Sequence, residues 1–164
     1  MKSAKLLLAI TLVIAASAVL SPAGHAQGFP SFLGSVVPEV SVDDLSKLIG
    51  DEQAMKKTVL VDVRSEAETS VSVIPGAITK AQYEAKAGEY AGKKVIVYCT
   101  VGGRSGAYAK QLAAKKIDVV NFKGSILAWA NAGQPFETLD RKPTNRVHTY
   151  SRGNRIPAAY EAVY

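Results

Sequence analysis

Residues 94–105 read Lys94-Val95-Ile96-Val97-Tyr98-Cys99-Thr100-Val101-Gly102-Gly103-Arg104-Ser105. The first half, residues 94–99, is mostly apolar and β-branched, which is typical of a strand buried on both faces of a parallel sheet. A glycine-rich loop follows at 100–104, and residues 105–116 are rich in Ala, Lys, Gln and Leu, which favour a helix. The stretch therefore predicts a buried strand, a tight loop and a helix, with Cys99 at the carboxyl end of the strand.

The position of Cys99 predicts a reactive thiol, because ligands of open parallel sheets bind beyond the carboxyl ends of the strands. Gly102 and Gly103 allow backbone conformations that turn several N–H groups inward as an anion-binding nest. The following helix adds its positive dipole end, and Arg104 adds a permanent cation. These groups should lower the pKa of the Cys99 thiol. The alternative is that Cys99 is a small buried hydrophobic residue that ends the strand.

Strands and helices are expected to alternate along the rest of the chain. Ser41 is a credible N-cap for a helix over 42–49, which Gly50 ends. Further strands are expected at 58–63, 77–78 and 117–122, and further helices at 81–90 and 125–132, with Trp129 in the core. This alternation predicts an α/β fold in which helices cover both faces of a small parallel sheet.

The N-terminus has the pattern of a secretory signal peptide. A short basic region precedes the apolar run 6–20, and small residues follow at Gly24 and Ala26. We expect a signal peptide at 1–26, a linker at 27–35 and a periplasmic or secreted protein. An uncleaved membrane anchor is the alternative, although the apolar run is shorter than the roughly 20 residues that span a bilayer.

Composition limits the other possibilities. The chain has 164 residues and 48% hydrophobic content, which fits one globular domain. Its single cysteine allows no intrachain disulfide, and after loss of His25 one histidine remains, too few for a structural zinc site. Nothing in the sequence demands a metal or an organic cofactor, and the net charge of +6 is not accompanied by a nucleic-acid-binding motif.

Four motifs in the right order resemble the rhodanese family. Residues 99–105 resemble its active-site loop, 59–65 and 74–78 its first and second signatures, and 123–135 its closing Gly…Trp…Gly-x-Pro segment. The resemblance covers most of a predicted domain at 36–138 and implies the rhodanese-like fold. Thr69 and the pair Ser72-Val73 depart from the family pattern, at positions that we expect to serve packing.

The resemblance implies transfer of sulfane sulfur from a donor such as thiosulfate to a thiophilic acceptor, through a persulfide on Cys99. Cys99 and Arg104 are the expected catalytic residues. The expected substrate-binding residues are Thr100, Val101, Gly102, Gly103 and Ser105, and Ser105 is also a candidate N-cap. The partners would be a small-molecule sulfur donor and acceptor, with no nucleic acid; a protein acceptor stays open, and a membrane enters only if the signal peptide is retained.

Two rival functions remain on sequence grounds. One is a non-catalytic rhodanese-like binding module that docks a partner or sequesters a sulfur species. The other is a redox or arsenate-type thiol enzyme, but the chain has no second, resolving cysteine. Related phosphatase and arsenate-reductase loops also resemble Cys-x5-Arg, whereas four residues separate Cys99 from Arg104. The shorter loop favours a sulfur atom over a larger tetrahedral oxyanion.

Charged residues outside the loop are expected to serve mainly structural roles. Asp62 and Arg64 are expected to form a structural polar network, with a supporting role for Asp62 near Cys99. Residues 139–164 form a basic C-terminal tail, for which a solvated, partly ordered segment is the favoured interpretation and a polyanion-binding tail the alternative. The apolar residues near its end also leave open that the tail docks on the domain. His148 in this tail is a less favoured candidate for a Cys–His pair with Cys99.

Overall fold

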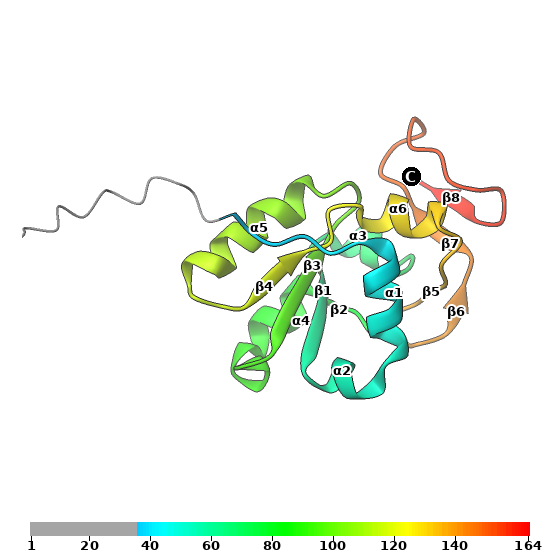
Figure 1. The fold of residues 1–164 in the computed structure, drawn as a ribbon. Helices are drawn as coiled ribbons and strands as arrows, with labels where there is room; N and C mark the ends of the chain where they lie inside the picture. The colour runs from blue at the N-terminus through cyan, green and yellow to red at the C-terminus, as the bar shows by residue number, and fades with distance from the viewer. Residues whose placement is uncertain (1–35) are drawn as a thin grey trace, which may run out of the picture. The chain divides into compact units, whose positions relative to one another are not determined.

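A four-stranded parallel sheet with the strand order β2-β1-β3-β4 lies at the centre of the fold (Figure 1). Its strands are β1 (Thr58–Asp62), β2 (Ile78–Thr79), β3 (Lys94–Tyr98) and β4 (Val119–Asn121). The computed structural model describes residues 36–164, so the expected signal peptide and the linker 27–35 lie outside the described residues. The predicted α/β class with a parallel sheet is confirmed.

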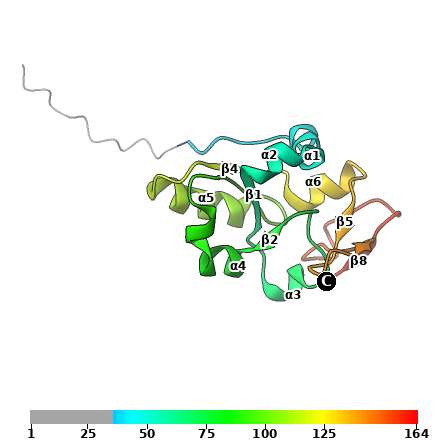
Figure 2. The ribbon, with the colours of Figure 1, turned by 90° about the horizontal axis from the view of Figure 1, so that it is seen from below.

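Alternate residues of the central strands enter two separate hydrophobic clusters. Leu60, Ile96 and Tyr98 pack with Leu45 and Trp129 from α1 (Val42–Gly50) and α6 (Ser125–Asn131). The residues between them point to the opposite face, because side chains alternate along a strand. Figure 2 shows α1 and α6 on one side of the strands and α4 (Lys80–Ala85) on the other. Both faces of the sheet are therefore covered, as the apolar strand sequences predict.

The second cluster lies beneath α4 and α5 (Gly103–Ala114). Val59, Val61, Val95, Val97 and Val119 of the sheet pack there against Tyr83, Tyr108, Ala109 and Leu112 of the two helices. The expected helix over 81–90 is divided at Lys86 into α4 and a 3-10 turn, η1 (Ala87–Tyr90). The division places the Tyr90 ring on the Tyr83 ring, with 5.6 Å between their centroids.

Two short helices, α2 (Glu52–Lys56) and α3 (Glu66–Thr69), complete the helical elements of residues 36–164. The expected N-cap of α1 is confirmed, since the Ser41 side chain accepts the N–H of Asp44 at 3.1 Å. The helix α2 was not predicted, because five residues are too few for a clear helical period. Within residues 36–164, no helix is long and apolar enough to cross a membrane.

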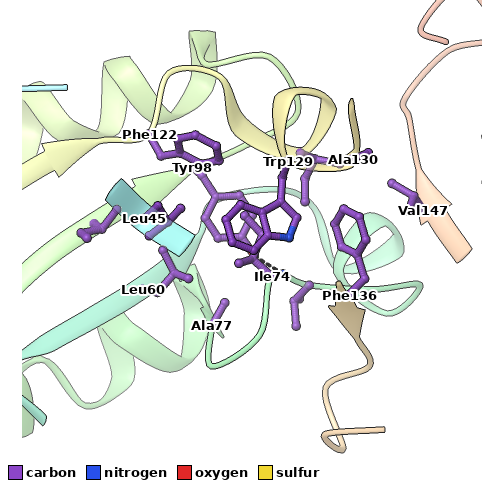
Figure 3. Packing of buried hydrophobic residues seen from close by; sticks show 13 residues of the cluster. Leu45, Leu60, Ile74, Ala77, Tyr98, Phe122, Trp129, Ala130, Phe136 and Val147 are labelled. Atoms are coloured by element: carbon purple, nitrogen blue, oxygen red, sulfur yellow. Dashed lines mark hydrogen bonds between the residues drawn. The ribbon is translucent and has the colours of Figure 1, made fainter. Parts of the chain in front are cut away.

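The C-terminal segment 139–164 is packed on the domain, which corrects the favoured expectation of a solvated tail and agrees with the docking alternative. After β5 (Phe136–Glu137), it forms the short strands β6 (Pro143–Thr144), β7 (Arg146–His148) and β8 (Glu161–Val163). Val147 is completely buried, and Figure 3 shows it beside Phe136 and Ala130. One buried valine and the pairing of β7 with β8 thus order a segment whose overall composition is basic.

Candidate active site around Cys99

Cys99 lies directly after β3 and just before the N-terminus of α5, as the sequence predicts. Only 1% of the residue is exposed. Its Sγ atom accepts a hydrogen bond from the Gly102 N–H at 3.1 Å, and α5 begins at the next residue. The thiol is therefore held at the positive end of a twelve-residue helix.

The surroundings of Cys99 change its acidity in two opposite ways. Burial raises the pKa of the Cys99 thiol, while hydrogen bonds from Ser105, Val101 and Gly102 lower it, and the net pKa is below its ordinary value. Because N–H donors stabilise a thiolate and a thiolate is the nucleophilic form, the loop favours a reactive sulfur.

The helix α6 fixes the loop from the other side. The N–H groups of Ile126 and Leu127 donate to the carbonyls of Cys99 and Thr100, at 3.2 and 3.3 Å. The Ser125 hydroxyl accepts the N–H of Cys99 at 3.1 Å and donates to the Phe122 carbonyl at 2.8 Å. Ser125 was not among the predicted site residues, since a serine at the start of a helix normally indicates only a cap.

Gly102 and Gly103 were expected to have the same role in the loop, but the structure gives them different roles. Gly102 has a φ of +95°, and a Cβ atom on it would lie 2.3 Å from the carbonyl oxygen of Lys123. Gly103 has no such conformation, and a Cβ there would meet nothing within 4 Å. The turn that presents an N–H to the sulfur therefore requires glycine only at Gly102.

The expected N-cap role of Ser105 is wrong. Gly102 occupies the cap position of α5, and the helix begins at Gly103. Ser105 is completely buried inside the first turn, where its hydroxyl donates to the Gly102 carbonyl at 3.2 Å. The left-handed turn at Gly102 starts the helix two residues before Ser105. Ser105 therefore lies beneath the loop, where it lowers the pKa of the Cys99 thiol.

Arg104 is paired with the carboxylate of Glu68, which was not among the predicted site residues. Its two terminal nitrogens donate to the two carboxylate oxygens of Glu68, each at 2.7 Å. The Thr100 hydroxyl lies between them, 2.8 Å from Arg104 and 3.0 Å from Glu68. Glu68 and Thr100 therefore fix the position of the Arg104 guanidinium. An interaction with Cys99 also raises the pKa of Arg104, after the larger effect of Glu68, so the cation acts on the sulfur from this fixed position.

Glu68 is only 3% exposed, yet it is held as a carboxylate. Burial raises its pKa, but hydrogen bonds from Arg104 and from the N–H and hydroxyl of Ser65 outweigh burial, and the net pKa is well below its usual value. Ser65 and Glu68 form a capping box at the start of α3. The Ser-x-x-Glu pattern at 65–68 was the sequence signal for this residue, although it indicates a helix start and not a partner for Arg104.

Asp62 and Arg64 form a completely buried ion pair, with 2.7 Å between Arg64 Nη2 and Asp62 Oδ2. Arg64 also donates to the carbonyls of Ser72 and His148, at 2.6 and 3.4 Å. Within residues 36–164, neither side chain hydrogen-bonds to the loop 99–105. The pair ties β1 to the Ser72 turn and to the C-terminal segment, so the supporting role expected for Asp62 at Cys99 is at most indirect, through the neighbouring strand β3.

A pocket of about 330 Å³ opens beside the sulfur. Its lining residues are Cys99, Thr100, Val101, Gly103, Arg104, Tyr150 and Asn154. Gly102 and Ser105 do not line it and act from beneath the loop. The Nδ1 atom of His148 accepts the N–H of Tyr150 at 3.2 Å, and His148 is not among the lining residues, so the geometry does not favour a Cys–His pair.

The rhodanese-like domain family matches residues 41–132, which is more than half of the chain. The chain belongs to this family. A sulfurtransferase of Allochromatium vinosum is 31% identical to the rhodanese-like domain over 106 residues, covering 61% of this chain and 94% of the relative. The resemblance inferred from the four motifs is thereby confirmed.

Two solved structures are similar to the rhodanese-like domain. A rhodanese-like domain protein from Staphylococcus aureus is 26% identical, with a TM-score of 0.52, and the match covers 62% of this chain and 98% of that one. A thiosulfate sulfurtransferase from Pseudomonas aeruginosa is also 26% identical, with a TM-score of 0.51, over 62% of this chain and 20% of that one. The family match ends at 132, so Tyr150 and Asn154 lie beyond it.

Proposed function

We propose that this rhodanese-like protein is a sulfurtransferase that carries a sulfane sulfur as a persulfide on Cys99, and that thiosulfate is a competent donor. The observation that carries the proposal is the position of the sulfur. Cys99 Sγ accepts an N–H bond at the N-terminus of α5, its pKa is lowered, and it lines a pocket.

The first half of the proposed reaction loads the cysteine. The Cys99 thiolate attacks the outer sulfur of thiosulfate and forms a new S–S bond. The S–S bond of thiosulfate breaks, and sulfite leaves with the bonding electron pair. One negative charge stays on the Cys99 persulfide, where the N–H groups that stabilise the thiolate can also stabilise the added sulfur.

The second half unloads the cysteine. A nucleophilic acceptor attacks the outer sulfur of the persulfide, the S–S bond to Cys99 breaks, and its electron pair returns to Sγ. The Cys99 thiolate is thereby regenerated without an oxidant or a reductant. The Arg104–Glu68 pair supports this cycle by holding the loop through Thr100.

The first measurement is the intact mass of the protein before and after excess thiosulfate. We expect a gain of about 32 Da, one sulfur atom, because the chain has a single cysteine to accept it. The Cys99→Ser variant is the matched control and should show no gain, with an unchanged circular dichroism spectrum. A wild-type protein that gains no mass would exclude thiosulfate as donor and favour the binding-module alternative. An equal gain in the variant would disprove the role of Cys99.

We also propose that the protein is exported, on the basis of the basic, apolar and small-residue pattern at 1–26. Expression of the full chain in a Gram-negative host should place it in the periplasmic fraction with Gln27 as its first residue. A product that retains Met1 and stays with the membrane fraction would support the uncleaved anchor instead.

A further inference from the structure

Two exposed apolar side chains flank the Cys99 pocket. Val101 is 60% exposed and Tyr150 is 68% exposed, and both line the pocket. In residues 36–164, only three other large hydrophobic residues are exposed, namely Val36, Leu139 and Tyr164. Single exposed hydrophobic residues are common on protein surfaces, but two at the entrance to one nucleophile form a shared apolar rim.

Tyr150 is held at this rim by a well-anchored turn. Thr149 next to it is completely buried, its N–H donates to Val163 at 2.9 Å, and its carbonyl accepts from Asn154 Nδ2 at 2.8 Å. Tyr150 itself has a φ of +70°, a conformation that tyrosine rarely adopts. Strained backbone of this kind persists where the surrounding structure enforces it, and it is frequent at functional sites.

The Tyr150 ring also contacts the catalytic loop. The Arg104 guanidinium lies 5.6 Å from the ring centroid, within the range of a cation–π interaction. Because Glu68 fixes Arg104 from the other side, the ring is linked through Arg104 to the loop that carries Cys99. A residue 51 positions after the cysteine (150 minus 99) thus becomes part of its entrance.

The pocket is larger than a small inorganic acceptor requires. Its volume is about 330 Å³, whereas one water molecule occupies about 30 Å³ in the liquid and cyanide is only slightly larger. Pockets for organic ligands begin at about 300 Å³. Cyanide at the sulfur would leave the apolar rim without contacts, while an organic group on the acceptor would cover it.

We propose that Tyr150, together with Val101, determines acceptor specificity by favouring a thiol carried on an apolar organic group over a small inorganic acceptor. The proposal rests on the persulfide function proposed above. The acceptor thiolate attacks the outer sulfur of the Cys99 persulfide and leaves as a new organic persulfide, and Cys99 departs as the thiolate. The apolar group of the acceptor packs on the Tyr150 ring during this attack.

The test loads the full-length protein with thiosulfate, removes excess donor, and follows the loss of the added sulfur by intact mass. The acceptors are benzyl mercaptan, 2-mercaptoethanol and cyanide, of which only the first carries an apolar ring. Tyr150→Ser should lower the ratio of the benzyl mercaptan rate to each of the other two rates about fivefold, which corresponds to about 1 kcal/mol. Tyr150→Phe should retain the wild-type rates, because the ring and not the hydroxyl makes the contact.

Tyr164→Ser is the matched control, since Tyr164 is an exposed tyrosine of the same segment that does not line the pocket. It should leave all three rates unchanged. If Tyr150→Ser slowed sulfur transfer to all three acceptors equally, Tyr150 would only support the loop. If the variant transferred sulfur to every acceptor at the wild-type rate, Tyr150 would have no role. Either result overturns the proposal.

A second readout separates this proposal from the proposed function. N-benzyl iodoacetamide and iodoacetamide both alkylate a thiolate, with or without persulfide chemistry. Tyr150→Ser should lower the rate ratio of the benzylated to the plain reagent at Cys99 about fivefold. If the ratio falls but the protein forms no persulfide, the role of the apolar rim stands and the proposed sulfurtransferase function is rejected. If the ratio is unchanged in a protein that does form a persulfide, only the role of the apolar rim is rejected.

Discussion

Replacing Gly102 with alanine is expected to reduce sulfur transfer about a hundredfold and to destabilise the domain. The new Cβ atom would lie 2.3 Å from the Lys123 carbonyl oxygen, which belongs to the backbone and cannot rotate away. The residue also has a φ of +95°, where a side chain costs roughly 1–2 kcal/mol. The loop must therefore move, and a displacement of about 1 Å near a reacting atom can cost a hundredfold in rate.

Two matched variants isolate this effect. Gly103→Ala should leave the unfolding midpoint unchanged or slightly higher, because its Cβ meets nothing within 4 Å and alanine favours a helix. Gly106→Ala, later in the same helix, makes only an ordinary contact at 3.5 Å with Asn121 Nδ2 and should keep normal turnover. Turnover of thiosulfate with cyanide and urea unfolding are the measurements. Full activity in Gly102→Ala would mean that the left-handed turn is not needed to present the N–H to Cys99.

Replacing Arg64 with methionine is expected to lower the free energy of unfolding by about 3–5 kcal/mol, because it leaves the buried Asp62 carboxylate without its partner. This loss is a large part of the roughly 5–15 kcal/mol that stabilises a typical domain. The change also removes hydrogen bonds to Ser72 and His148. The C-terminal segment should therefore become sensitive to proteolysis at lower urea concentrations than the rest of the domain.

The control is an exposed ion pair of the same chain. Lys123 lies 3.4 Å from Glu39 with 68% of its side chain exposed, and Lys123→Met should change the urea midpoint very little. The double variant Asp62→Leu/Arg64→Met should recover part of the lost stability, since it removes the unpaired charge as well. If Arg64→Met were as mild as Lys123→Met, the pair would not hold β1 to the C-terminal segment.

The sequence alone predicted a parallel sheet and the position of Cys99 at the end of one of its strands. Both depend on local patterns, because a strand buried on two faces shows as a continuous apolar run, as at 94–99. A cysteine directly after such a run must lie at the carboxyl edge of a parallel sheet. The glycines of the loop were also recognisable, although the sequence could not separate Gly102, which the turn requires, from Gly103, which it does not.

Only the tertiary structure decided which distant groups meet Cys99 and its loop. Glu68 meets Arg104 across 36 positions, Ser125 meets the Cys99 amide across 26, and Tyr150 reaches the pocket from beyond the family match. The strands that order the C-terminal segment have two or three residues each, too few to show a period. Such contacts arise when packing brings separate elements together, and no local pattern of residues encodes a distance between them. The sequence therefore determined Cys99 and the loop and helix start that surround its sulfur. The packing of the chain determined which distant residues lie next to them.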